Sequence, residues 1–316
     1  RDVAAGLNTA CFISGYRGSP LGSVDLGLWQ AREFVKKNHI HFRAGINEEL
    51  AATAVWGSQQ LGLFPGAKYD GIFSIWYGKG PGVDRSGDAL KHANMAGTAR
   101  HGGVLAVAGD DHVAKSSSVA HQSDHIFKAC GLPVFFPSNV QEILDLGLHG
   151  LALSRFSGLW TGLKTIQEVV ESSSIVSIDP DRVHIHLPED FDMPPGGLHI
   201  RWPDSPLEQE ARLMDHKWYA ALAYIRANRL NHTVLDSHHA QLGLIASGKA
   251  YNDLRQALHD LGLDDDDCRR IGLRVHKVAV VWPLEATITR EFAAGLREIL
   301  VIEEKRQMIE YQLKEE

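Results

Sequence analysis

The chain has 316 residues, of which 44% are hydrophobic and 22% are charged, and its formal net charge is −7. This composition excludes an intrinsically disordered chain, and an acidic balance without a long Lys/Arg cluster argues against a nucleic-acid partner. No apolar run is long enough to cross a bilayer, so we expect no membrane association. The length allows two domains.

Short apolar runs alternate with helical patterns over residues 1–187. Strands separated by helices predict an α/β fold, with a doubly wound, mostly parallel sheet covered by helices on both faces. The predicted strands cover residues 10–14, 39–43, 71–76, 103–108, 132–136, 159–163 and 182–187, and the predicted helices cover 23–37, 48–60, 89–100, 124–129, 140–154 and 166–172.

Residues 188–235 are predicted to connect this domain to a second one. The stretch 188–206 holds five prolines and a Gly-Gly pair, and a helical pattern follows over 207–229. Residues 236–316 then predict a smaller α/β domain, in which the acidic run from Asp264 to Asp267 is expected to be a solvated loop. Its predicted strands are 242–247, 275–282 and 299–303, and its predicted helices are 250–261 and 285–296.

The three cysteines, Cys11, Cys130 and Cys268, are far apart and form no C-x-x-C pair. A zinc site or an iron–sulfur cluster needs several thiolates on short loops, so we expect neither in this chain, and no other metal site. Reduced thiols, two of them buried, indicate a cytoplasmic protein. The chain opens at Arg1 without a methionine, so we expect it to be part of a longer protein.

The strongest local signal is the helix start at Asn47-Glu48-Glu49-Leu50-Ala51-Ala52. Asn47 is a good N-cap, and two acids in the first turn are explained by the helix dipole alone. However, the segment follows a strand, which places Glu48 at the carboxyl edge of a parallel sheet, where ligands bind. The small apolar residues behind Glu48 also predict a partly desolvated acid.

A second signal is the loop from Gly15 to Gly22, which follows the first strand. Its glycines allow the backbone to approach a ligand, but their spacing is not G-x-G-x-x-G, so a Rossmann dinucleotide site is disfavoured. A tight turn explains the glycines equally well. Arg17 and Ser19 favour an anion or carboxylate site.

A third loop, from Gly109 to Asp124, combines Asp, His and Ser residues after a strand. No G-x-S-x-G elbow accompanies them, so a polar loop facing a ligand is favoured over a catalytic triad. Further on, residues 243–250 nearly spell a P-loop, but Ala250 replaces the hydroxyl that would bind magnesium, which disfavours ATP or GTP binding.

In this order, the loops resemble those of the alpha chain of indolepyruvate ferredoxin oxidoreductases and, more distantly, of other 2-oxoacid:ferredoxin oxidoreductases. The similarity runs over nearly the whole chain, which would correspond to the N-terminal part of such a protein. The matching pieces are Gly15 to Pro20, Asn47 to Ala51, Lys79 to Asp84, Gly109 to Asp111 with the serines that follow, Gly131 to Val134, Ile245 to Gly248 with Tyr251, Trp282 to Leu284, and Val301 to Glu304.

The resemblance implies a thiamine-diphosphate pyrimidine-binding domain and a smaller transketolase-C-terminal-like domain, in an enzyme that oxidatively decarboxylates 2-oxoacids to acyl-CoA. Glu48 looks like the family's catalytic glutamate that bonds the pyrimidine ring, with Glu49 as the fallback. Ser19 matches the position near the substrate carboxylate, with Arg17 beside it. By the same resemblance, Tyr16, Gly18 and Asp110 are expected to bind the cofactor.

Two departures qualify the resemblance. This chain has Lys79-Gly80 where relatives have Lys-His, and it lacks the Gly-Asp-Gly and Asn that hold magnesium diphosphate. The resemblance therefore places the diphosphate domain with its Mg²⁺, the iron–sulfur clusters and a gamma-type domain outside this chain, on the same or a partner polypeptide. Ferredoxin and coenzyme A are the expected partners, and a homodimer is expected.

Two other classes of protein stay open at this point. A beta-type subunit of a 2-oxoacid dehydrogenase has a similar two-domain layout, although the turn from Gly15 to Pro20 and the serines at 116–118 argue against it. A non-catalytic α/β module that only binds a partner or a nucleotide would leave Glu48 without a role in turnover.

Overall fold

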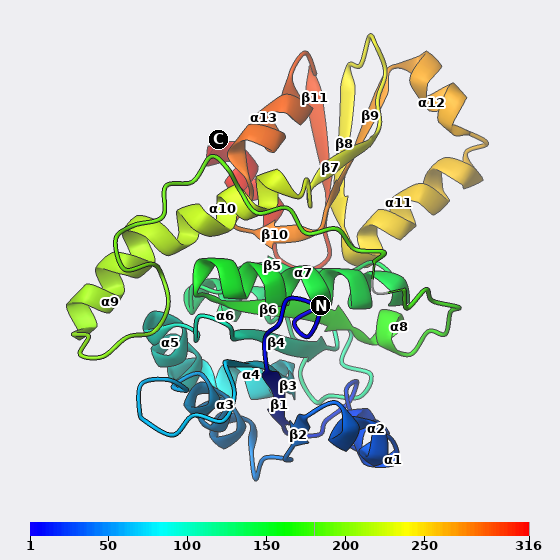
Figure 1. Cartoon of the computed structure of the whole chain (residues 1–316). Coiled ribbons are helices and arrows are strands. Elements are labelled where there is room, and N and C mark those ends of the chain that lie inside the picture. Colours follow the sequence, from blue (N-terminus) through cyan, green and yellow to red (C-terminus); the bar gives the residue numbers. More distant parts are fainter. Residues whose placement is uncertain (180, 316) are drawn as a thin grey trace.

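The computed structural model describes residues 1–179 and 181–315. Figure 1 shows a larger α/β unit at the bottom and a smaller one at the top, joined by α9 (Pro206–Arg212) and α10 (Trp218–Ala227). The predicted fold class is confirmed: a doubly wound, mostly parallel sheet of the pyrimidine-binding kind with a smaller transketolase-C-terminal-like α/β unit.

The larger sheet has seven strands in the order β10-β5-β6-β4-β3-β1-β2. All neighbours are parallel except β10, which runs antiparallel to β5. The strands are β1 (Thr9–Gly15), β2 (Ile40–Phe42), β3 (Gly71–Lys79), β4 (Gly103–Asp110), β5 (Val134–Phe135), β6 (Trp160–Ile166) and β10 (Val280–Trp282).

Helices cover both faces of this sheet because its central strands alternate between two apolar faces. In β4, Val104 and Ala106 join one core cluster and Leu105 joins the other. The first face carries α3 (Glu48–Ser58), α4 (Gly80–Arg85), α5 (Gly87–Ala96) and α6 (Asp124–Ala129), and the second carries α7 (Val140–Ser157) and α10. Short helices α1 (Val24–Gln30), α2 (Arg32–Lys37) and α8 (Gln167–Val170) complete this unit.

The smaller sheet has the order β11-β8-β9-β7, and only β7 is antiparallel. Its strands are β7 (His232–Leu235), β8 (Leu242–Ser247), β9 (Leu273–Val278) and β11 (Glu298–Ile302), and its helices are α11 (Gly248–Asp260), α12 (Asp265–Ile271), α13 (Ala286–Ala293) and α14 (Ile309–Glu315). The domain boundaries predicted at residues 187 and 235 stay a prediction. Strand β10 belongs to the C-terminal third of the chain but pairs in the larger sheet, so the two sheets do not divide the chain at one point.

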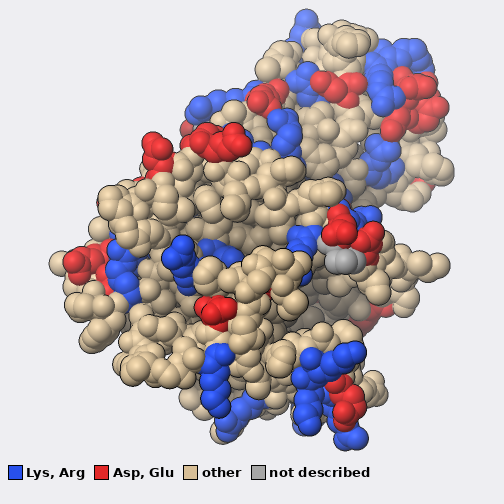
Figure 2. Space-filling model, viewed as in Figure 1, with Lys and Arg blue, Asp and Glu red and all other residues tan. Residues whose placement is uncertain are grey.

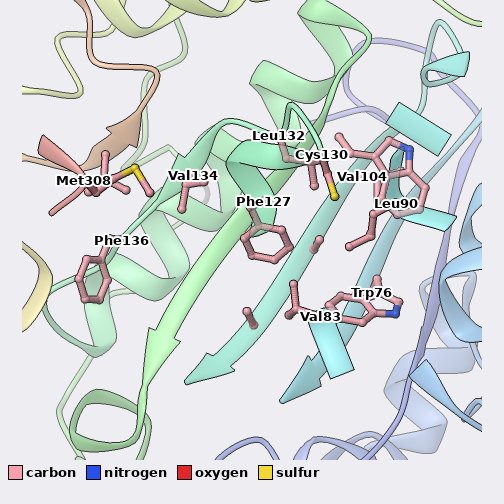
Figure 3. Packing of buried hydrophobic residues seen from close by; sticks show 14 of the residues in the cluster. Trp76, Val83, Leu90, Val104, Phe127, Cys130, Leu132, Val134, Phe136 and Met308 are labelled. Atoms are coloured by element: carbon pink, nitrogen blue, oxygen red, sulfur yellow. The ribbon is translucent and has the colours of Figure 1, made fainter. Parts of the chain in front are cut away.

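The two units are packed together through the core and through polar pairs. Figure 3 shows Met308 beside Val134 and Phe136, in the same cluster as Trp76 and Phe127. His112 Nδ1 lies 2.8 Å from a carboxylate oxygen of Glu304. Gln122 and Arg306 exchange two hydrogen bonds, Gln122 Nε2 to the Arg306 carbonyl (2.8 Å) and the Arg306 amide to Gln122 Oε1 (3.0 Å).

Two strand predictions were wrong. Residues 182–187 form no strand, because the side chain of Asn228 takes the backbone bonds of His186, donating to its carbonyl and accepting from its amide. The single strand predicted over 275–282 is divided between two sheets as β9 and β10. Asn231 Oδ1 accepts from the amides of Ala279 and Val280, both at 2.9 Å, and so holds the chain where it passes from one sheet to the other.

The helix predictions also needed correction at two places. The long helix over 207–229 is interrupted by a π-helical segment, Leu213–Lys217, which brings the fully buried Lys217 ammonium within 3.1 Å of the Met95 carbonyl at the end of α5. Burial lowers the pKa of Lys217 to about 7. The acidic run is no loop, because Asp264 caps the Asp267 amide and Asp265 begins α12.

Surface charges are mixed in sign. On the face drawn in Figure 2, basic and acidic side chains lie interspersed over a largely uncharged surface. Several are paired within one helix, as in α12, where Arg269 bonds Asp266. Within the described residues, no helix is long and apolar enough to span a membrane. All three cysteines are free and buried, one more than predicted.

A buried histidine makes the stability of the smaller unit depend on pH. His276 in β9 is fully buried against Phe292, and burial lowers its pKa from 6.5 to about 3. Below pH 6.5 His276 is therefore protonated in the unfolded chain, whereas in the folded chain it stays neutral until about pH 3. Stability is lost across that window as pH falls, by about 1.4 kcal/mol per pH unit.

We predict that His276→Phe removes the part of the pH-dependent loss of unfolding free energy that comes from protonation of His276. Urea unfolding at pH 7, 5.5 and 4.5 should show a shallower decline in the free energy of unfolding than in the wild type. The exposed His259, changed to Asn, serves as the control and should keep the wild-type slope. Identical slopes for His276→Phe and the wild type would contradict the assignment.

Candidate functional site

The predicted site residues gather at one edge of the larger sheet. Strands β1, β3 and β4 are parallel neighbours, so their carboxyl ends, Gly15, Lys79 and Asp110, lie at the same edge. The loop from Gly15 to Gly22, the helix α4 and the loop after Asp110 therefore start side by side. This is the edge at which open α/β sheets bind ligands.

Glu48 lies at this edge and is only 7% exposed, whereas its neighbour Glu49 is exposed. The Asn47 side chain caps α3 by accepting from the Leu50 amide at 2.8 Å, which fixes the first turn. Trp76 Nε1 donates to the Glu48 carbonyl at 2.9 Å and ties that turn to β3. The helix start thus aims a carboxylate into the sheet edge, as predicted from the sequence.

Two glycines make the space for this carboxylate. A Cβ atom on Gly82 would lie 2.5 Å from Glu48 Cγ and 2.7 Å from Oε1, and a Cβ atom on Gly78 would lie 3.4 Å from Cγ. Across residues 1–179 and 181–315, no group donates a hydrogen bond to the Glu48 carboxylate. The Glu48 carboxylate thus lies at the sheet edge with no donor from the described residues and can accept a hydrogen bond from a ligand.

The loop from Gly15 to Gly22 packs tightly on the neighbouring strand ends. A Cβ atom on Gly15 would collide with the Tyr77 carbonyl, and one on Gly18 would lie 2.8 Å from Lys79 Cδ. Tyr16 and Arg17 are exposed, whereas Gly18 and Ser19 are half-buried. The structure therefore brings the predicted cofactor and substrate residues of this loop to the edge that Glu48 occupies.

Asp110 and Asp111 hold the third loop in place. Asp110 is fully buried and accepts from the amide (2.7 Å) and the hydroxyl of Ser123. Burial opposes its ionisation, but His121, Lys164 and Ser123 outweigh burial and lower the pKa of Asp110. Asp110 is thus engaged with its own loop, and its assignment to a cofactor stays a prediction.

Asp111 also fixes this loop, by accepting hydrogen bonds from its serines. Its carboxylate accepts from the amides of Lys115 (3.0 Å), Ser116 (2.6 Å) and Ser117 (3.1 Å) and from the Ser116 hydroxyl. These bonds outweigh the effect of burial and lower the pKa of Asp111 to about 2. Ser123 lies 3.4 Å from His121 but is fully buried, so the loop presents no accessible serine–histidine pair for hydrolysis.

His121 belongs to the loop that the sequence predicts to face a ligand, but its place between two carboxylates was not predicted. Its Nε2 lies 2.9 Å from Asp84 of α4, and its Nδ1 lies 3.5 Å from Asp110. Burial opposes protonation, but the two carboxylates outweigh burial and raise the pKa of His121. A Cβ atom on Gly80 would collide with the His121 ring, so this imidazole fills the place left by the glycine at position 80.

The P-loop-like turn is packed against an aromatic side chain. Residues 243–250 do form a strand followed by a helix, β8 and α11, and Gly248 has a positive φ of 51°. However, a Cβ atom on Gly248 would lie 2.5 Å from the Phe136 ring, which covers the turn. The prediction against nucleotide binding at this turn is thus supported by an aromatic ring that fills it.

The larger sheet and the second α/β unit share their fold with two solved enzyme structures. A 2-oxoglutarate:ferredoxin oxidoreductase from Magnetococcus marinus superposes with a TM-score of 0.62 at 14% identity, covering 99% of this chain and 58% of that one. A transketolase from Leishmania mexicana superposes with a TM-score of 0.52 at 15% identity, covering 92% and 35%.

Sequence comparison confirms the predicted resemblance. Residues 231–316 match the indolepyruvate ferredoxin oxidoreductase middle domain. The chain is 26% identical to the indolepyruvate oxidoreductase subunit IorA of Methanothermobacter thermautotrophicus over 308 residues, 96% of this chain and 44% of that protein. It is 26% identical to the Pyrococcus abyssi subunit IorA over 262 residues. The chain is thus related to subunits of oxidoreductases of the 2-oxoacid:ferredoxin type, and it spans less than half of these relatives' length.

We predict that Gly82→Ala displaces the Glu48 carboxylate or shifts α4. The added methyl group meets a side chain whose far side is packed, so the free energy of unfolding should fall by about 1–3 kcal/mol. Gly87→Ala is the matched control, because nothing lies within 4 Å of its Cβ position at the start of α5. Urea unfolding and a crystal structure of each variant test this, and a Gly82→Ala structure in which neither Glu48 nor α4 has moved would contradict it.

Proposed function

We propose that this chain supplies the pyrimidine half of a thiamine-diphosphate site, in an enzyme that oxidatively decarboxylates 2-oxoacids to acyl-CoA and passes electrons to ferredoxin. One observation carries the proposal. The Glu48 carboxylate is buried at the carboxyl edge of the sheet, lies on Gly82 and Gly78, and has no protein donor among the described residues. It is therefore free to share a proton with a ring nitrogen of a bound cofactor.

The residues present fit the pyrimidine side of this cofactor. Thiamine diphosphate, if bound here, would supply the nucleophilic carbon that 2-oxoacid decarboxylation requires. Glu48 would hold the proton on the pyrimidine ring, and a largely desolvated carboxylate suits that task. Tyr16 and Gly18 lie on the neighbouring loop and would flank the ring. Asp110 would contribute to cofactor binding indirectly, by fixing the position of the loop that follows β4.

The diphosphate end does not fit this chain. The glycine-aspartate pair at the end of β4 uses its carboxylate for Ser123 and His121, and no Gly-Asp-Gly with a later Asn occurs in the sequence. We assign the diphosphate and its Mg²⁺ to a domain outside this chain. The iron–sulfur cluster and the gamma-type domain also belong elsewhere in the complete enzyme, either fused or as separate subunits, and a homodimer would complete each site between protomers.

The substrate assignment rests on the relatives and on one loop. Indolepyruvate is the substrate that the relatives' names give. Ser19 is half-buried and Arg17 exposed on the loop at the same edge, so a hydroxyl and a guanidinium are available to a 2-oxoacid carboxylate. Coenzyme A would accept the acyl group. Three free, buried thiols favour a reducing, cytoplasmic setting.

We predict that Glu48→Gln in the complete protein cuts thiamine-dependent decarboxylation by about 10²–10⁴-fold, because the amide no longer accepts the proton. Steady-state turnover with an arylpyruvate, coenzyme A and ferredoxin measures this. The exposed neighbour gives the control: Glu49→Gln should turn over within about threefold of the wild type, a difference well under 1.4 kcal/mol. Near-normal turnover of Glu48→Gln with an intact fold would refute the proposal.

A further inference from the structure

His121 joins three elements at the sheet edge. It lies in the loop after β4, and its side chain is only 10% exposed. Its Nε2 lies 2.9 Å from Asp84 Oδ2 on α4, and its Nδ1 lies 3.5 Å from Asp110 Oδ1 at the end of β4. An imidazole that faces carboxylates on both sides connects the two elements that carry them.

The helix that His121 contacts also forms the floor of the Glu48 site. Gly80, at the start of α4, lies directly under the His121 ring, and Gly82 lies under the Glu48 carboxylate. Asp84, which bonds His121, follows two residues later. Helix α4 therefore contacts both side chains: Gly80 packs against the His121 ring, Gly82 packs against the Glu48 carboxylate, and Asp84 bonds His121.

Tertiary packing holds this helix against α3, α5, α6, β3 and β4, with Val83 in the main core cluster. Six residues are too short to be stable as an isolated helix, so tertiary contacts decide where it lies. Lys79 precedes it without a side-chain cap, and Val83 is a buried apolar side chain on it. Among the described residues, Asp84 to His121 is the one ion pair that α4 makes. The charge-assisted bond is thus its strongest directional contact.

We propose that His121 is a positioning residue, which holds α4 through Asp84 and Asp110 so that Gly82 stays against the Glu48 carboxylate. This inference rests on the proposed function of Glu48. His121 touches neither cofactor nor substrate in this account, because both of its ring nitrogens face protein carboxylates. Its loss should therefore lower kcat through a displaced Glu48 and leave the KM for the 2-oxoacid nearly unchanged.

Amide substitutions at position 121 distinguish the contact with Asp84 from the contact with Asp110. In His121→Gln the side-chain amide reaches the place of Nε2 and keeps a donor for Asp84. In His121→Asn the shorter amide lies near the place of Nδ1 and loses Asp84. Asp84→Ala breaks the same bond from the half-exposed side of α4, where the change should not endanger folding. His92→Asn, on an exposed histidine of α5, is the control.

Hydrogen exchange provides a readout that does not depend on catalysis. We expect His121→Asn and Asp84→Ala to speed exchange of the amides of residues 83–86 by about tenfold or more in the complete protein, since a bond to a charged group contributes about 1.5–3 kcal/mol. His121→Gln and His92→Asn should stay within about threefold of the wild type. The double variant His121→Asn with Asp84→Ala should exchange no faster than either single variant, because both remove one bond.

Turnover of the same variants completes the test. We expect kcat to fall about 10- to 100-fold in His121→Asn and Asp84→Ala, with the KM for the 2-oxoacid within about threefold and with His121→Gln largely rescued. Unchanged exchange in His121→Asn, additive effects in the double variant, or a Gln variant as impaired as the Asn variant would overturn the inference. Failure of the proposed function would show differently, as normal turnover in Glu48→Gln while the exchange results stand.

Discussion

The contact between the Glu48 carboxylate and the two glycines beneath it is the constraint on which the rest of the site depends. Glu48 is only 7% exposed, and no group among the described residues donates a hydrogen bond to its carboxylate, which leaves the carboxylate available to a ligand. Gly82 and Gly78 let the carboxylate lie flat against the sheet edge. Any larger residue at position 82 would push the acid away from the place where a ligand would meet it.

The same device recurs along the sheet edge. Gly18 admits the Lys79 side chain, Gly109 admits Pro20 and Leu21, and Gly80 admits His121. Glycines let loops from β1, β3 and β4 pack within van der Waals distance of one another. The polar side chains of Asp110 and Asp111 then fix the third loop by internal hydrogen bonds. The loops at this edge thus pack closely around the Glu48 carboxylate.

Much of this arrangement follows from the sequence, because it depends on local signals. The alternation of strands and helices, the N-cap Asn47 and the place of Glu48 after a strand are readable from neighbouring residues. What could not be read depends on long-range side-chain bonds. Asn231 bonds the backbone between β9 and β10, so one apolar run is divided between two sheets. Asn228 bonds the backbone of His186, within residues that the sequence predicts to be a strand. His121 was expected in a polar loop that faces a ligand, but its bond to Asp84 could not be predicted, because Asp84 lies 37 residues away in sequence.

The most direct test of the central claim is the rate of deuterium exchange at C2 of thiamine diphosphate bound to the complete protein with Mg²⁺. In the proposed role, Glu48 would hold the pyrimidine proton and would therefore set this rate before any substrate binds. The account predicts that Glu48→Gln slows exchange by at least about 100-fold, whereas Glu49→Gln leaves it unchanged. Equal exchange rates in the Glu48→Gln variant and the wild type, with cofactor bound in both, would contradict it.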